Sequence, residues 1–179
     1  GDRVAIGILQ VDPGDPSVVN AGLVRVYEWN DSNWVQLGGD NMKGLFANDN
    51  AGYSVDINYA GDRVVIGEKN YWTPGGPISG RVSVYDYLGN FQFNFGEQGS
   101  KDGQFNYPHE IVYKGGRIFI ADYNNHRIQI FDKSGNFIGK FGNSTLLSGP
   151  KTVSVSDIGE IYVTDLFATF KYVTKSGCE

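Results

Sequence analysis

The sequence predicts an all-β fold built from short antiparallel strands, and three observations support this. The 179 residues include 25 glycines and only one methionine, and 14% of them are aromatic. Glycine is favoured in tight turns, whereas β-branched and aromatic residues are favoured in strands. A glycine followed by a polar residue and an apolar strand recurs four times, and an alternating segment follows each copy. Because side chains of a strand point alternately to its two faces, such segments bury one face in a core.

The recurring apolar strand, strand B, defines a repeat. Successive copies start 60, 55 and 43 residues apart, and the surplus length of the early copies lies in Gly- and Pro-rich insertions at residues 10–21 and 70–79. Self-similarity over such distances indicates a solenoid or a propeller. Strand B is predicted at residues 1–7, 61–67, 116–122 and 159–165, and the alternating strand C at residues 23–27, 81–85, 127–131 and 170–174.

Two further strands complete the repeat. Turns rich in Gly, Asn and Asp close a hairpin from strand C to strand D in three copies, and a strand A precedes strand B in the last three. Four antiparallel strands per repeat form the blade of a β-propeller. The predicted ranges are 34–37, 91–95 and 137–141 for strand D, and 53–57, 111–113 and 152–155 for strand A.

We therefore predict one β-propeller array of about four blades. The first blade lacks strand A and the last lacks a clear strand D, which leaves open edges at residues 1–6 and 170–174. Closed rings hide such edges, because an open edge strand promotes aggregation. The array is thus expected to be part of a larger ring, or to be completed by a neighbouring chain. The predicted blades are residues 1–46, 47–98, 99–143 and 144–179.

Residues 99–142 resemble an NHL repeat. The resemblance rests on Gly103-Gln104-Phe105, on Pro108, on the strand at 116–122, on the segment 125–132 that begins Asn-His-Arg, and on Phe141-Gly142. A second copy at residues 149–177 begins Gly149-Pro150 and continues into a matching strand at 161–165. There the Asn-His-Arg segment is replaced by Leu-Phe-Ala-Thr.

Residues 1–87 resemble FG-GAP-like repeats instead, through residues 24–29, 52–55 and 61–67. Both families form propellers of usually six or seven blades, so the resemblance implies a ring larger than four blades. Both mostly present binding surfaces, and a fold by itself does not imply an activity.

Charge and composition exclude several classes of function. A formal charge of −5 and a pI near 5.0 disfavour nucleic acid as a partner, because such binding depends on neutralising phosphates. The longest apolar runs are far shorter than the roughly 20 residues of a membrane span, so no span is predicted. Cys178 is the only cysteine and permits neither an internal disulfide nor a cysteine metal cluster. It is either a free thiol or one half of a bridge to residues outside this sequence or to a partner.

Three residues are candidates for the mouth of the central channel. His109 and Glu110 follow Pro108 at the start of a strand A, and Lys151 follows Pro150 at the matching place. The NHL resemblance implies that an enzyme of this kind, such as an amidating lyase or a lactonase, would hold a metal there. Two histidines in the chain are too few for a multi-histidine zinc site, so we predict no metal and no cofactor. The candidates are either a solvated channel lining or a catalytic pair.

Other motifs give weaker signals. Residues 48–52 offer one carboxylate and two amides, which is a poor calcium loop and an ordinary turn. Asn30 and Asn143 begin glycosylation sequons in predicted loops. Tyr71 and Trp72 open the second insertion, where they either contact a partner or fold back over their own blade.

The sequence favours a non-enzymatic module with a structural, adhesive or protein-binding role, located outside the cell or at its surface, as part of a larger assembly. Its partner would be a protein or a glycan, or a second copy of the chain bound through open blade edges. The alternative is a propeller hydrolase or lyase whose active site lies at the central channel and partly outside these residues.

Overall fold

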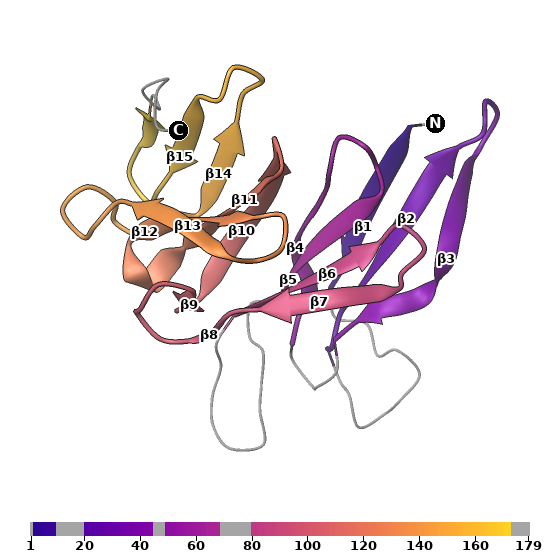
Figure 1. Cartoon of the computed structure of the whole chain (residues 1–179), viewed down its shortest axis with the longest axis horizontal. Helices are drawn as coiled ribbons and strands as arrows, with labels where there is room; N and C mark the ends of the chain where they lie inside the picture. Colours follow the sequence, from indigo (N-terminus) through magenta and orange to yellow (C-terminus); the bar gives the residue numbers. More distant parts are fainter. Residues whose placement is uncertain (1, 10–19, 45–48, 69–79, 173–179) are drawn as a thin grey trace.

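The structure, a computed structural model, describes residues 2–9, 20–44, 49–68 and 80–172 (Figure 1). The described residues form four consecutive antiparallel sheets, as predicted for blades of a β-propeller. The first sheet contains β1 (Arg3–Ile8), β2 (Leu23–Trp29) and β3 (Trp34–Lys43), and the second contains β4 (Ala51–Ile57), β5 (Arg63–Glu68), β6 (Arg81–Asp86) and β7 (Phe91–Phe95).

The third sheet follows the same order as the second, and the fourth has three strands in its described part. Two short segments lie outside these sheets: a parallel pair that precedes the third sheet, and a single 3-10 turn, η1 (Tyr123–Asn125). The remaining strands are β8 (Glu97–Gln98), β9 (Gln104–Phe105), β10 (Pro108–Lys114), β11 (Arg117–Asp122), β12 (Arg127–Asp132), β13 (Phe137–Phe141), β14 (Thr152–Val155), β15 (Ile161–Thr164) and β16 (Thr169–Tyr172).

The apolar cores lie between neighbouring sheets, so central strands are buried on both faces. In β5, Val64 and Ile66 pack toward the first sheet, whereas Val65 packs toward the third. In β11, Ile118 packs toward the second sheet and Phe119 toward the fourth. Because both faces of β5 and β11 are covered, their sequences are continuous apolar runs rather than alternating ones.

Side chains of the inner strands connect one sheet to the next. Ser54 Oγ in β4 accepts a hydrogen bond of 2.7 Å from the backbone N–H of Ile111 in β10. At the equivalent position of β10, Glu110 Oε2 accepts a 3.0 Å bond from the N–H of Val153 in β14. The inner strands belong to separate sheets, so these bonds fix the height of each blade relative to the next.

Neighbouring blades also approach closely through glycine. A Cβ added to Gly7 in β1 would lie 2.1 Å from the carbonyl oxygen of Gly52 in β4. Real Cβ atoms do not reach that distance, so the first and second blades can pack this closely only because residue 7 has no side chain.

Candidate functional site

The inner strands of the four sheets line an open cavity of about 450 Å³. The predicted candidates His109, Glu110 and Lys151 all line it, together with residues of β1 and β4. The structure thus brings the three candidates together, whereas their chemical role stays a prediction. The full lining is Gly7, Gly52, Tyr53, Ser54, Val55, His109, Glu110, Lys151 and Thr152.

An aromatic group surrounds His109. Tyr53 Oη lies 3.3 Å from His109 Nδ1, and the two rings meet edge to face. On its other side the imidazole packs against Tyr123, with ring centroids 4.7 Å apart, and Tyr107 lies 5.7 Å away. Sequence reasoning missed all three tyrosines. Only Tyr53 had a signal in the sequence. It lies in strand A of its repeat at the position that His109 occupies in the next repeat.

Glu110 has a structural contact as well as a place in the cavity. Its Oε2 atom accepts the Val153 N–H described above. Burial raises the pKa of the Glu110 carboxyl, the hydrogen bond from Val153 lowers it, and the negative charge of Asp56 raises it. The net direction is upward, because a carboxylate in a partly dry site is less well solvated than in water.

The raised pKa gives the Glu110→Gln variant a defined pH dependence. The folded state binds this proton more tightly than the unfolded state, so the wild type loses stability as pH rises above about 4.3, the ordinary pKa of a glutamate. Glutamine keeps an acceptor for Val153 but does not titrate. We expect the free energy of unfolding of the variant, minus that of the wild type, to increase with pH in urea denaturation between pH 4 and 7.

Glu160→Gln is the matched control with the opposite sign. Hydrogen bonds from Lys171 and Tyr162 lower the pKa of Glu160. Its stabilising contribution is therefore present at neutral pH and is lost as pH falls through the lowered pKa. The difference between this variant and the wild type should decrease as pH rises. Equal slopes for the two variants would contradict the assignment.

Lys151 lies immediately before β14 and is exposed. Its backbone N–H donates a 2.8 Å hydrogen bond to the carbonyl of Thr164, which holds the main chain in place. Lys114, Lys140 and Lys171 each form an ion pair with a carboxylate. No such pair involves the Lys151 ammonium within the part of the chain that the structure describes.

The Asn-His-Arg segment has structural contacts. Asn125 donates hydrogen bonds to the Gly99 carbonyl and to Asp122, and His126 Nδ1 lies 3.0 Å from the carbonyl oxygen of Leu147. Arg127 pairs with the buried Asp122 at 2.8 Å. The segment therefore ties the ends of β11 and β12 to the chain on both sides.

A similar ion pair in the second blade was missed by sequence reasoning. Arg81 at the start of β6 pairs with Glu68 at the end of β5 at 2.5 Å, and Ser83 donates to the same carboxylate. All three residues are buried. The signal was available, because Glu68 and Arg81 occupy the places of Asp122 and Arg127 in the next repeat.

The remaining candidates differ in how far the structure describes them. Tyr71, Trp72 and Cys178 lie outside the described residues. Asn30 and Asn143 are exposed, and each side-chain oxygen accepts two backbone hydrogen bonds of its own turn.

Of the possible calcium loop at residues 48–52, the structure describes residues 49–52. Asp49 is fully buried, and its charge contributes to raising the pKa of Glu68. Among the described residues, no three or more His, Cys, Asp or Glu side chains group as a metal site would require. Within the same ranges, no helix has the length and apolar character needed to cross a membrane.

Comparison with known proteins supports the NHL resemblance. The NHL repeat model matches residues 105–131. Protein brain tumor of Drosophila melanogaster is 33% identical over 114 residues, which cover 62% of this chain and 10% of that protein. Protein lin-41 of Caenorhabditis elegans is 43% identical over 82 residues, or 40% of this chain and 7% of that protein. Human NHL repeat-containing protein 3 is 36% identical over 70 residues, or 38% and 20%.

These matches do not support the resemblance of residues 1–87 to FG-GAP-like repeats. They also show that the chain spans a small part of each of these relatives, a fifth at most.

Solved structures confirm the fold. The periplasmic gluconolactonase PpgL of Pseudomonas aeruginosa superposes with a TM-score of 0.62 over 99% of this chain and 52% of its own, at 12% identity. Identity this low shows a shared fold alone. The chain is therefore a β-propeller array that contains an NHL repeat at residues 105–131.

Proposed function

We propose that this chain is a protein-binding propeller module that contacts its partner through the mouth surface, defined as Tyr53, Tyr107, His109, Tyr123 and Lys151. The observation that carries the proposal is convergence. These side chains come from three successive blades, and they line the central cavity or pack around His109 beside it. Tyrosine is enriched at protein interfaces, because it offers a large rigid contact area with a polar end.

A peptide selection tests the proposal. Random peptides displayed on phage are selected against the purified chain, and the enriched sequences are synthesised and measured by fluorescence polarisation. We expect His109→Ala to weaken their binding at least tenfold, because the imidazole contacts three tyrosines of the mouth surface. Peptides that bind His109→Ala as tightly as the wild type would contradict the proposal.

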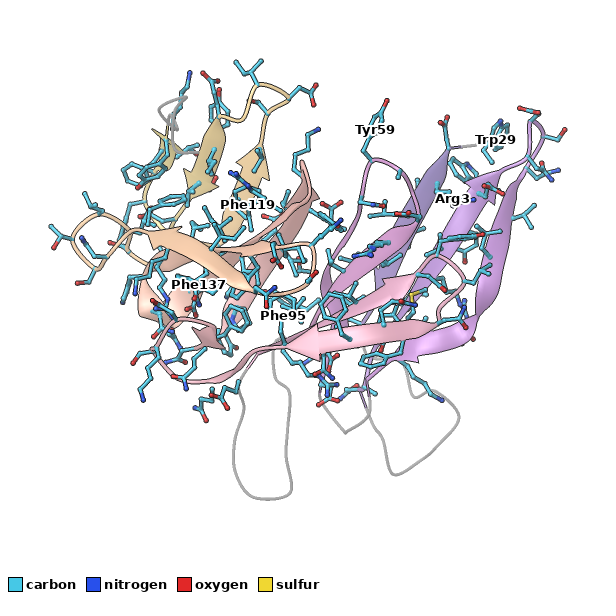
Figure 2. The ribbon with its side chains drawn as sticks, viewed as in Figure 1. Arg3, Trp29, Tyr59, Phe95, Phe119 and Phe137 are labelled. Atoms are coloured by element: carbon cyan, nitrogen blue, oxygen red, sulfur yellow. The ribbon has the colours of Figure 1, made fainter. Side chains whose placement is uncertain are left out.

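Tyr59→Ala is the matched control. Tyr59 is fully exposed in the turn between β4 and β5, at the end of the blade opposite to the start of β4 (Figure 2). Its removal also deletes an exposed aromatic side chain, but away from the cavity. We expect binding to change less than twofold, and a loss equal to that of His109→Ala would show that the contact is not at the mouth.

The rival function, a hydrolase or lyase at the channel, is tested with the same variants. Gluconolactone is offered as substrate, since a gluconolactonase shares the fold. Turnover that disappears in His109→Ala would favour the enzyme over the binding module.

An extracellular or cell-surface location, a glycan partner and self-assembly through blade edges stay predictions. Asn30 and Asn143 are exposed, which a glycan at either residue would require.

A further inference from the structure

One position of the inner strands has a hydrogen-bond donor in three successive blades. Tyr53 and His109 immediately precede Ser54 and Glu110, the two acceptors of the equivalent hydrogen bonds between blades. Lys151 precedes Thr152, which occupies the same place in β14. The three side chains therefore start from equivalent positions of successive blades and line the same cavity. We call these three residues the donor row.

The donor row can satisfy an acceptor that has several lone pairs. Tyr53 Oη and His109 Nδ1 lie 3.3 Å apart and share one hydrogen bond, so with a neutral imidazole this pair offers a ligand at most one donor, and the Lys151 ammonium supplies the charged donors. A carboxylate accepts from several donors at once, and bonds from a charged donor such as Lys151 are the stronger ones. The cavity of about 450 Å³ is large enough to admit a side chain.

Tyr107, beside the row, has an unfavourable backbone conformation. Its φ is +64°, in the left-handed region that disfavours residues with a large side chain. Two other residues shortly before inner strands also have positive φ: Asn50 before β4, at +52°, and Gly149 before β14, at +95°. Asparagine and glycine tolerate this conformation, so the fold does not require a tyrosine here.

The position of its ring gives a reason for the tyrosine. The Tyr107 ring lies 5.7 Å from that of His109 and 6.4 Å from that of Tyr123. Strained backbone of this kind is concentrated at ligand sites, where the surrounding structure maintains it. Tyr107 is thus placed to form an apolar wall next to the donor row.

We propose that the donor row binds the carboxylate of an acidic side chain in a partner protein, and that Tyr107 packs against the apolar part of the same segment. This rests on the proposed function of the mouth surface. A peptide carboxylate fits better than a nucleic-acid backbone, because the chain carries a net charge of −5 and would repel a polyanion.

Removing the charge of Glu110 tests whether the cavity binds a negatively charged group. Glu110 lines the same cavity, although its Oε2 atom is engaged by the Val153 N–H. A bound carboxylate would be repelled by any charge on Glu110. Glu110→Gln should therefore strengthen binding of a carboxylate and leave binding of a neutral amide unchanged.

The experiment is an NMR titration of the ¹⁵N-labelled chain with N-acetylglutamate amide and, in parallel, N-acetylglutamine amide. The two probes differ only in the carboxylate. We expect the acid to shift the amide resonances of Tyr53, His109 and Lys151, with an affinity at least tenfold higher than that of the amide. Equal affinities, or a preference for the amide, would overturn the proposal.

Two variants separate the local charge of Lys151 from the net charge of the chain. Lys151→Gln should weaken binding of the acid at least fivefold, while Arg117→Gln should change it less than twofold. Arg117 is an exposed cation at the start of β11, the end of that strand away from the Tyr123 turn, so both variants alter the net charge equally. A loss as large in Arg117→Gln would show that only net charge matters and would overturn the site.

Tyr107→Asn tests whether the Tyr107 ring, on its strained backbone, contacts the ligand. It should weaken binding of both probes, while the midpoint of thermal unfolding stays unchanged or rises, because asparagine tolerates the left-handed conformation. A clear fall in the midpoint would show that the ring is structural and would overturn the role of Tyr107.

The peptide selection separates a failure of the carboxylate site from a failure of the proposed function. If selected peptides bind at the mouth with no preference for acidic residues, the module binds proteins but the donor row does not read a carboxylate. If no peptide binds at the mouth, the proposed function itself fails. A single-stranded oligonucleotide that displaces the acid with higher affinity would replace the peptide partner with nucleic acid.

Discussion

Replacing Arg127 with methionine is expected to lower the free energy of unfolding by about 3–5 kcal/mol, as for other buried ion pairs that lose one partner. The Arg127 side chain is 7% exposed, and that of Asp122 is fully buried. Arg127 also donates 2.8 Å hydrogen bonds to the carbonyls of Ser100, Lys101 and Gln104. The variant leaves a buried carboxylate without its cation and frees the loop before β9.

Urea denaturation at two pH values measures this effect. Burial is the main cause that raises the pKa of Asp122, and the loss of Arg127 removes an influence that lowers it. Protonating Asp122 relieves the unpaired charge, so the deficit of the variant should be smaller near pH 4 than at pH 7. Arg117→Met removes an exposed arginine from the same blade and should change stability by less than about 0.5 kcal/mol. Similar losses in both variants would contradict the structural role of Arg127.

Replacing Phe105 with alanine is expected to cost a similar amount, about 3–5 kcal/mol. Phe105 is fully buried in the core between the second and third sheets. Its ring centroid lies 6.4 Å from that of Phe95 in β7 and 5.6 Å from that of Phe131 in β12. Figure 2 shows Phe95 where the two blades meet. The truncation leaves a cavity at this junction that side chains from both blades cannot easily fill.

The control for this prediction is Phe167→Ala. Phe167 is 82% exposed, so its truncation removes little buried area and should leave the unfolding midpoint almost unchanged. A domain has a total stability of roughly 5–15 kcal/mol, so loss of Phe105 should remove a large share of it. Equal midpoints for the Phe105 and Phe167 variants would show that the contact between these blades contributes little.

Features with a local cause could be predicted from the sequence alone. The turns from strand C to strand D are an example, because Asp86 and Asp132 each accept hydrogen bonds from backbone N–H groups two and four residues later. Such turns depend on neighbouring residues only. Strand B of the two middle blades was recognisable because burial on both faces leaves a continuous apolar run.

The grouping of His109, Glu110 and Lys151 was also accessible, because equivalent positions of successive repeats face the same axis. The rest of the site required the tertiary structure. Tyr53 and Tyr123 reach His109 from other strands and turns, and the +64° φ of Tyr107 has no local signal in its sequence.

The sequence by itself determined the strands, their turns, the repeat and the positions of the last two blades that face the channel, since each depends on local residues or on periodicity. Only the tertiary structure decided which side chains meet at the mouth and how the inner strands are joined. Those contacts link residues more than 40 positions apart, such as Glu110 to Val153 and Ser54 to Ile111. Their geometry is set by how closely whole blades pack, which no local pattern encodes.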